Sequence, residues 1–479
     1  MKKQVNIFRI FRIILAGIVF AGAWCAVWFV PELTGFFTAQ YGSSFLEVLA
    51  EISLGAVFAV VSITIITLLI GRVYCSVICP LGIMQDIFSI FPRKSRFIQN
   101  TRKVKYPVFI SGVVMVALGV MIPWSILMPS ANFVQIVNYC FRESAYLAGI
   151  SETTSNPAMT TMIVSWLLFF ILLILVRWKG RIYCNTLCPV GTVLGIFSRF
   201  ALYKVKIDPE KCVSCGACEA ICKAGCIDAG AKTVNNEDCV MCMNCLNKCK
   251  FDALKFSYSV NQEPEMPGRR DFITGGTALA GGLAAGIVLR KSAKPENAVM
   301  PPGALDFDRF TSLCIGCGLC ISACRGDVLA PAVTQYGLRG FMQPYLDYDK
   351  GECRFHCTKC SQVCPCGALK PLTREEKQQL KIGVAVYNPQ LCVAYIAGED
   401  CGACAEHCPV GALSMIPYDE TTIPRVNEKL CIGCGACQHI CPVTPVKAII
   451  IKGSPIQKFA EKPEPEKVVK LDAEEEFPF

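Results

Sequence analysis

The chain holds 32 cysteines in 479 residues, and most of them recur in groups of four at short spacings. Two such groups follow one another between residues 201 and 260: Cys212, Cys215, Cys218 and Cys222, then Cys239, Cys242, Cys245 and Cys249. Three closely spaced thiolates bind one face of an iron–sulfur cubane, and the fourth cysteine of such a run ligates the neighbouring cluster. The spacing predicts two 4Fe–4S clusters, in which Cys249 completes the first group and Cys222 the second.

Four more groups lie between residues 293 and 452. They are Cys314, Cys317, Cys320 and Cys324; Cys353, Cys357, Cys360 and Cys364; Cys392, Cys401, Cys404 and Cys408; and Cys431, Cys434, Cys437 and Cys441. A disulfide-bonded secreted scaffold is also rich in cysteine, but such scaffolds are short and lack long apolar segments. With one group for each cluster, the sequence predicts six 4Fe–4S clusters in all.

Four other cysteines lie in a duplicated motif, Gly-Arg-x-Tyr-Cys-x-x-x-Cys-Pro-x-Gly, at residues 71–82 and 180–191. They are Cys75, Cys79, Cys184 and Cys188. Duplication of the whole motif argues against the simpler interpretation, in which these are small buried apolar residues. If the two motifs meet, the four thiols can form a seventh centre, either one more cluster or a pair of reversible disulfides.

The elements that must position these cysteines begin with a membrane domain over residues 1–200. The chain is 53% hydrophobic, and four segments there are long enough to cross a bilayer of about 30 Å, at residues 8–30, 52–71, 106–128 and 160–178. Basic residues lie before the first segment, between the second and third, and after the fourth, whereas loops 31–51 and 129–159 hold only Arg142. The positive-inside rule then places both ends of this unit in the cytoplasm. We expect a polytopic all-α domain of four helices in two parallel repeats, each ending in one cysteine motif at the same membrane face.

The soluble elements follow. We expect α+β bacterial ferredoxin-like domains at residues 201–260, carrying two clusters, and at residues 293–452, carrying four. Residues 453–479 are rich in Lys, Glu and Pro and are expected to form a disordered tail.

Residues 261–292 connect the two ferredoxin-like domains. They hold Arg269 and Arg270 followed by a weakly apolar stretch at 275–289, which resembles a twin-arginine translocation signal placed inside a chain. A fifth crossing here would leave residues 201–260 in the cytoplasm and carry residues 293–479 into the periplasm of a bacterial inner membrane. The alternative is a linker or interfacial helix that leaves the C-terminal half in the cytoplasm.

Two function classes are excluded by the same residues. The net charge of +9 is not a nucleic-acid signal, because the basic residues gather at the ends of the apolar segments. There is no CxxCH haem site, no flavin or dinucleotide fingerprint, and no nucleophile with a base. Substrate chemistry beyond electron transfer must therefore belong to a partner.

These motifs resemble a known family. Residues 1–260 resemble the NapH type of membrane ferredoxin, and residues 268–450 resemble its exported four-cluster partner NapG, so the two are expected to be fused in one chain. The MauN and MauM proteins share this plan. The resemblance implies a quinol dehydrogenase subunit that oxidises quinol and passes electrons to a periplasmic reductase or cytochrome, with nitrate reductase as the example. The alternatives are another acceptor, or an accessory redox or maturation role for a periplasmic metalloenzyme.

Resemblance to four-cluster ferredoxins also implies which groups share ligands. In those proteins the outer groups exchange their last cysteine, and so do the inner ones. By that resemblance Cys441 completes the first C-terminal cluster and Cys324 the fourth, while Cys408 completes the second and Cys364 the third. No residue identifies a quinone pocket, and Tyr74 and Tyr183 are named for it only as guesses.

Overall fold

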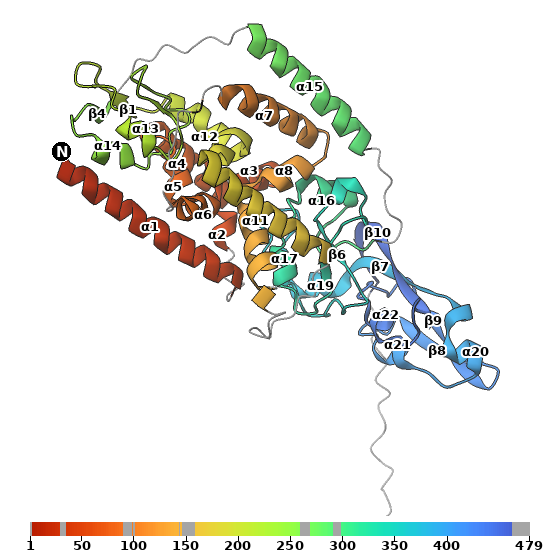
Figure 1. Cartoon of the computed structure of the whole chain (residues 1–479). Coiled ribbons are helices and arrows are strands. Elements are labelled where there is room, and N and C mark those ends of the chain that lie inside the picture. Colours follow the sequence, from red (N-terminus) through yellow and green to blue (C-terminus); the bar gives the residue numbers. More distant parts are fainter. Residues whose placement is uncertain are drawn as a thin grey trace, which may run out of the picture.

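A computed structural model describes residues 2–28, 35–89, 98, 101–142, 144–145, 159–258, 269–290 and 298–461. Figure 1 shows a group of long helices with small ferredoxin-like regions at its two ends, one formed around β1 and β4 and the other around β7 and β10. One hydrophobic core runs from the first helix through both of these regions. The helices and the cysteine-rich regions therefore pack as parts of one molecule.

In the part of the chain that the structure describes, three helices are long and apolar enough to cross a membrane. They are α1 (Lys2–Trp28), α11 (Met159–Lys179) and α15 (Arg269–Arg290), with qualifying stretches at Ile7–Trp28, Thr161–Lys179 and Ile273–Arg290. Helix α4 (Leu54–Ile70) is also apolar but has 17 residues, which at 1.5 Å each span about 26 Å. These four helices lie on the first, second and fourth expected spans and on the expected fifth segment. The molecule is therefore compatible with membrane insertion.

The third expected span, residues 106–128, is not one helix. Helix α7 (Thr101–Ala117) ends before Gly119, whose φ of +80° is left-handed, and α8 (Ile122–Leu127) starts anew with Pro123 in its first turn. A left-handed glycine ends helices and a proline begins them, so the break follows from these two residues. Three short elements after the break are α8, α9 (Pro129–Gln135) and the π-helix η2 (Ile136–Arg142).

The duplicated cysteine motifs have similar surroundings. Helix α4 ends at the left-handed Gly71 and is followed by α5 (Tyr74–Val77) and α6 (Pro80–Phe88). Helix α11 is followed by the left-handed Gly180, the π-helix η3 (Tyr183–Leu187) and α12 (Pro189–Arg199). In both copies the proline after the second cysteine starts the next helix. Helices α2 (Gly35–Thr38) and α3 (Tyr41–Ala50) precede the first copy, and the broken segment described above lies between the two copies.

The first ferredoxin-like region is built on two antiparallel strand pairs. Strand β1 (Tyr203–Ile207) pairs with β4 (Leu254–Tyr258), and β2 (Ile227–Asp228) pairs with β3 (Thr233–Val234). Two short helices, α13 (Ala217–Ala220) and α14 (Asn244–Lys248), carry cysteines between the strands.

The C-terminal region consists of two lobes. The first contains α16 (Phe307–Leu313), α17 (Leu319–Ser322), β5 (Leu329–Pro331), η4 (Leu338–Gly340), β6 (Pro344–Leu346), α18 (Lys359–Gln362) and α19 (Arg374–Gln379). The second contains β7 (Leu380–Tyr387), η5 (Pro389–Leu391), α20 (Val393–Ala397), α21 (Ala403–Glu406), β8 (Leu413–Tyr418), β9 (Thr421–Val426), α22 (Ala436–Ile440) and β10 (Ile449–Phe459). Strands β5 and β6, β7 and β10, and β8 and β9 pair antiparallel.

The expected tail begins later than the sequence suggested. Residues 453–459 belong to strand β10, and Gln457 ties this strand to the first lobe, because its side chain accepts from the amide of Gly303 and donates to the carbonyl of Pro301. The composition of the segment did not reveal these contacts. Residues 462–479 lie outside the described part of the chain.

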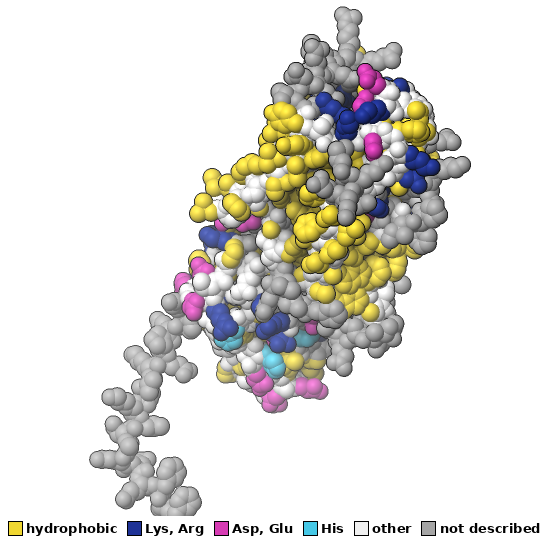
Figure 2. Space-filling view, turned by 90° about the vertical axis from the view of Figure 1, so that its left-hand side faces the viewer, with side chains coloured by type: hydrophobic (Ala, Val, Ile, Leu, Met, Phe, Trp, Pro, Cys, Tyr) yellow, Lys and Arg dark blue, Asp and Glu magenta, His cyan; other side chains and the backbone are white. Residues whose placement is uncertain are grey.

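The surface of the helical part is apolar. Figure 2 shows hydrophobic side chains gathered over the middle of one face, with charged side chains towards either end. Exposed apolar side chains of the helical part include Phe11 in α1, Phe58 in α4 and Ile174 in α11, which are 63%, 75% and 61% exposed. Apolar side chains that are exposed on several neighbouring helices are typical of a surface that contacts lipid.

Candidate iron–sulfur centres

The clearest cysteine site lies in the first ferredoxin-like region. Cys222 lines one apolar cavity together with Cys239, Cys242 and Cys245. The fourth cysteine of the first group has therefore joined the three of the second group, as the spacing predicts. Among the described residues, no group of three or more ligand side chains is close enough to hold a single metal ion. The cavity lined by four thiols is consistent with a larger, polynuclear group.

The backbone of this site also fits a cluster. The residues two and four positions after Cys239 are Met241 and Met243, and both are left-handed, with φ of +52° and +60°. A side chain larger than glycine seldom adopts this conformation without a compensating role. Alternation of right- and left-handed residues turns successive N–H groups into an anion-binding concavity, which recurs at iron–sulfur sites.

The same two positions are left-handed in three other groups. The pairs are Ser214 and Gly216, Gly316 and Gly318, and Gly433 and Gly435. Four of the six groups thus have the backbone shape that suits thiolates bound to a cluster.

At the other site of the first region, three of the four expected cysteines lie near one another. Cys218 lies close enough to Cys212 and Cys215 to interact electrostatically with both. Cys249, the expected fourth ligand, follows α14, which packs against the helix α13 that carries Cys218. Its place at this cluster stays a prediction.

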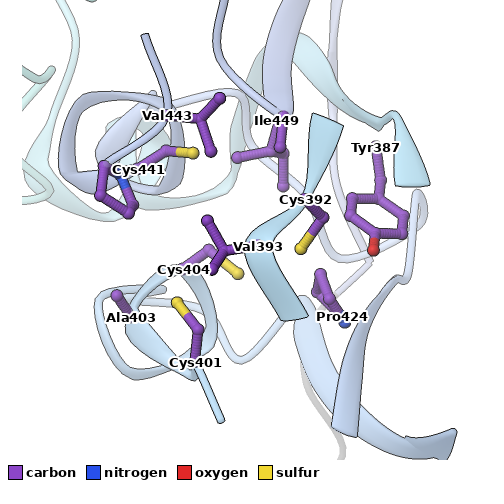
Figure 3. A pocket seen from close by; sticks show the side chains of 12 residues that line it. Tyr387, Cys392, Val393, Cys401, Ala403, Cys404, Pro424, Cys441, Val443 and Ile449 are labelled. Carbon is purple, nitrogen blue, oxygen red and sulfur yellow. The ribbon is translucent and has the colours of Figure 1, made fainter. Parts of the chain in front are cut away.

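In the C-terminal region, each lobe brings two groups of cysteines together. In the first lobe one cavity is lined by Cys314, Cys317, Cys320 and Cys364. Cys360 interacts electrostatically with Cys353, Cys324 and Cys357. In the second lobe the cavities are lined by Cys392, Cys401, Cys404 and Cys441, and by Cys408, Cys431, Cys434 and Cys437. Figure 3 shows the first of these two, with Cys441 reaching it from the segment that follows α22.

The expected pairing, in which the two outer groups exchange their last cysteines and the two inner groups do the same, is therefore wrong. Neighbouring groups exchange their last cysteines, so that Cys364 joins the first group and Cys324 the second, while Cys441 joins the third and Cys408 the fourth. The reason is the division into lobes. The first and fourth groups belong to different lobes and cannot share a ligand, whereas the two groups within each lobe are adjacent.

This pairing gives a direct prediction. In a Cys441→Ser variant, the cysteines that become reactive towards an alkylating reagent should be Cys392, Cys401 and Cys404, because they lose the fourth ligand of their site. Mass spectrometry of the alkylated peptides makes the measurement. If Cys314, Cys317 and Cys320 became reactive instead, Cys441 would be the fourth ligand of the first group, as the resemblance to four-cluster ferredoxins implied.

Burial governs the protonation of these thiols. It raises the pKa of Cys242 to about 11, and it raises the pKa of Cys317 and of Cys434 to about 12. At neutral pH and without a cluster such thiols are protonated, so cluster binding must displace their protons.

Two cysteines outside the groups lie in these cavities. Cys226 lines the cavity of Cys222, and Cys366 lines the cavity of Cys364. In the sequence, neither cysteine belongs to one of the six groups. Only the fold shows that they contact predicted ligands.

The duplicated motifs do meet. Cys75, Cys79, Cys184 and Cys188 are all buried, and each of Cys79, Cys184 and Cys188 interacts electrostatically with cysteines of the other motif. Two buried arginines join the copies reciprocally. Arg72 of the first donates to the carbonyl of Cys184 at 3.1 Å, and Arg181 of the second donates to the carbonyl of Cys75 at 2.7 Å.

The glycines that close each motif make room for these contacts. A Cβ on Gly82 or on Gly191 would overlap the carbonyl oxygen of Cys75 or Cys184, respectively. Arg181 also pairs with Asp86 at 2.7 Å, whereas Arg72 donates to Asn185 and approaches the sulfur of Cys75 at 3.9 Å. Buried guanidinium groups are costly unless they face negative charge. Their position beside four thiols suits a centre of net negative charge.

The two tyrosines of the motifs occupy matching places. Tyr74 donates its hydroxyl proton to Gln40 at 2.7 Å, and Tyr183 donates to the carbonyl of Leu127 at 2.9 Å and accepts from Asn132 at 2.8 Å. Both rings are buried. With their hydroxyl groups bonded inside the protein, the tyrosines link the cysteine motifs to α2–α3 and to α8–α9.

Comparison with known proteins agrees with the cysteine sites. A 4Fe–4S binding domain family matches residues 52–98 and 159–208, which include the duplicated motifs. A 4Fe–4S dicluster domain family matches residues 313–368 and 399–444, and a further 4Fe–4S binding domain family matches residues 205–228. Each dicluster match lies within one lobe.

Relatives include several ferredoxin-type proteins. The methylamine utilization ferredoxin-type protein MauM of Methylorubrum extorquens is 32% identical over 187 residues, which are 36% of this chain and 83% of MauM. The ferredoxin-type protein NapF of Escherichia coli is 34% identical over 150 residues, or 31% of this chain and 82% of NapF. The putative electron transport protein YccM of Escherichia coli is 24% identical over 42% of this chain and 55% of its own length. The chain belongs to the ferredoxin-type 4Fe–4S proteins, whose role is electron transfer.

Proposed function

We propose that this chain oxidises quinol in a bacterial inner membrane and passes the electrons to a periplasmic reductase such as nitrate reductase. The observation that carries the proposal is the position of Cys75, Cys79, Cys184 and Cys188 between the two ferredoxin-like regions. The two ferredoxin-like regions that would carry the six predicted clusters lie at opposite ends of the group of helices (Figure 1), so a relay between them needs a centre in the middle.

On one side, the motifs contact the first ferredoxin-like region next to its ligands. Arg181 donates its backbone amide to the carbonyl of Lys223, which follows Cys222, and Asn185 donates to the carbonyl of Ala224. Arg72 donates to the carbonyl of Glu237, two residues before Cys239. The cluster site of Cys222 and Cys239 is therefore the one that faces the duplicated motifs.

On the other side, the contact runs through α9 and η2. Asn132 bonds Tyr183, and one turn further on Gln135 donates to the carbonyl of Gly316 at 2.8 Å. Gly318 packs so closely on Tyr139 that a Cβ there would lie 2.9 Å from its hydroxyl oxygen. Gly316 and Gly318 flank Cys317, so the first C-terminal site is the one that faces the membrane part.

We further propose that the four thiols hold a seventh 4Fe–4S cluster. Such a cluster supplies one-electron storage, and the residues around it supply a dry site, buried arginines and fixed thiols. The match of a 4Fe–4S binding domain family to both motifs supports this choice over reversible disulfides.

The sidedness is part of the proposal. Helix α15 carries the apolar stretch Ile273–Arg290, and its crossing would put the two-cluster region in the cytoplasm and residues 298–461 in the periplasm. An alkaline phosphatase fused after residue 300 should then be active in cells. The matched control is a fusion placed in loop 31–51, which should be active. If that control is active and the fusion after residue 300 is not, the four-cluster region lies in the cytoplasm.

The test of function is anaerobic reduction by a short-chain quinol. Quinol added to the purified full-length chain should reduce the clusters, and a soluble artificial acceptor should then reoxidise them over many turnovers. Clusters that are present but are not reduced by quinol would overturn the proposal.

A second candidate keeps the relay but changes its destination. The name of the relative MauM refers to methylamine utilization, which favours an acceptor other than nitrate reductase or an accessory role in maturing a periplasmic metalloenzyme. A maturation protein need not turn over quinol at respiratory rates, so the same assay separates it from the relay.

A further inference from the structure

Cys226 is a fifth cysteine at a four-cysteine site. Its sulfur lies 3.6 Å from the sulfur of Cys222, and its side chain is 3% exposed and lines the cavity of Cys222, Cys239, Cys242 and Cys245. It also interacts with the sulfur of Cys239. The thiol therefore lies beside two expected ligands of one cluster.

Cys366 repeats this arrangement in another domain. Its sulfur lies 3.9 Å from the sulfur of Cys364, and its side chain is 2% exposed and lines the cavity of Cys314, Cys317, Cys320 and Cys364. In both cases the fifth cysteine contacts the exchanged ligand, the cysteine that leaves its own group to complete a neighbour. The two spacings differ, since Cys226 follows Cys222 by four residues and Cys366 follows Cys364 by two. The same contact is thus reached from two different local sequences.

The two sites share a second property. They are the sites whose ligand loops contact the membrane part, through Lys223 and Arg181 on one side and through Gly316 and Gln135 on the other. In the cavities of the second C-terminal lobe, the described lining residues include four cysteines each and no fifth. The extra thiols accompany the two clusters that would exchange electrons with the duplicated motifs.

We propose that Cys226 and Cys366 each donate an S–H hydrogen bond to the sulfur of the exchanged ligand and thereby raise the reduction potential of that cluster. Hydrogen bonds to cluster sulfurs stabilise the reduced form, which carries the extra negative charge, and they are a main determinant of potential. The proposal rests on the clusters of the proposed function being present. Cys226 and Cys366 act through their neighbours and are positioning residues, not ligands.

The experiment compares Cys226→Ala, Cys366→Ala and Cys25→Ala in the purified full-length chain. Cys25 is the matched control, because it is also outside every group but is exposed in α1. Each chain is titrated with reductant while its clusters are followed by electron paramagnetic resonance, and its iron is counted. We expect one cluster to shift to a lower potential in each of the first two variants, with full iron content, and no shift in Cys25→Ala. Cys226→Ser, which restores an O–H donor, should return most of the shift.

Other outcomes of the experiment are read as follows. Loss of one cluster's iron in an alanine variant would make the fifth cysteine a ligand and overturn the proposal, as would unchanged potentials with full iron. If Cys226→Ala does not assemble, Cys366→Ala tests the same claim in a separate domain. A wild-type chain that binds no clusters would contradict the proposed function itself, before this inference is reached.

Discussion

A Cys184→Ser variant is expected to keep its six ferredoxin-type clusters and to lose quinol-dependent reduction of the acceptor. Cys184 is buried in the centre that we propose joins the two ferredoxin-like regions, and its carbonyl accepts a hydrogen bond from Arg72 of the other motif. Without its sulfur the centre between the two ends is broken, so electrons cannot pass even though each end is intact. Turnover should fall to the background rate measured with quinol and acceptor alone.

The matched control is Cys140→Ser. Cys140 is also fully buried in the membrane part, in η2, and belongs to no predicted centre, so it controls for placing a hydroxyl group in an apolar interior. Iron analysis adds a second readout. A seventh cluster would be lost from Cys184→Ser as one cluster's iron, whereas a disulfide centre would leave the iron content unchanged. Full quinol oxidation by Cys184→Ser would remove the duplicated motifs from the electron path.

The cysteine groups were predictable because their information is local. A thiol every third residue suits one face of a cubane, and the same local run forces the left-handed residues at Met241 and Met243. The duplicated motif was predictable for a similar reason, since Gly82 and Gly191 are required wherever the Cys75 and Cys184 carbonyls approach the next helix.

Other features depended on contacts between distant segments. Which group Cys441 completes is decided by the lobe to which it belongs, and spacing holds no information about lobes. Cys226 and Cys366 carried no signal, because their role lies in one sulfur–sulfur contact each. The prediction of one continuous helix over the third span was wrong because hydropathy is averaged over many residues. The average does not register that Gly119 ends one helix and that Pro123 starts another.

A buried ion-pair cluster around Lys105 forms the joint between α7 and the first ferredoxin-like region. Lys105 is fully buried, and its ammonium group lies 2.8 Å from Glu237 and 2.8 Å from Asp238, the two residues that precede Cys239. The remaining oxygen atoms are also bonded, since Thr101 donates to Oδ2 of Asp238 at 2.6 Å and Arg102 donates to Oε2 of Glu237 at 3.1 Å. Tyr106 donates to Oε1 of Glu237 at 2.8 Å, the oxygen that Lys105 also contacts. The carboxylates can remain charged in this buried place because Lys105 lies between them.

A Lys105→Met variant should lose about 3–5 kcal/mol of stability at this joint, because two buried carboxylates are left without their shared cation. Hydrogen exchange of the amides in β1 and in residues 235–240 measures the free energy of local opening. Lys255→Met is the matched control in the same domain. Its ion pair with Asp208, at 3.5 Å, joins side chains that are 43% and 24% exposed, and its loss should cost less than about 1 kcal/mol.

The same joint should weaken in acid. Burial by itself raises the pKa of Glu237, but Lys105 and the hydrogen bonds from Lys105 and Tyr106 bring this pKa below its ordinary value. A carboxyl group with a lowered folded-state pKa stabilises the fold above its unfolded pKa of about 4.3 and loses that contribution as the pH falls through the folded value. Opening of residues 235–240 should therefore become easier below about pH 4 in the wild type. The same pH change should have a smaller effect in Lys105→Met, where the ion pair between Lys105 and Glu237 is already lost. Equal acid sensitivity of the two chains would show that the buried cation does not hold this joint, and the loop of Cys239 would then need another support for its contact with Arg72.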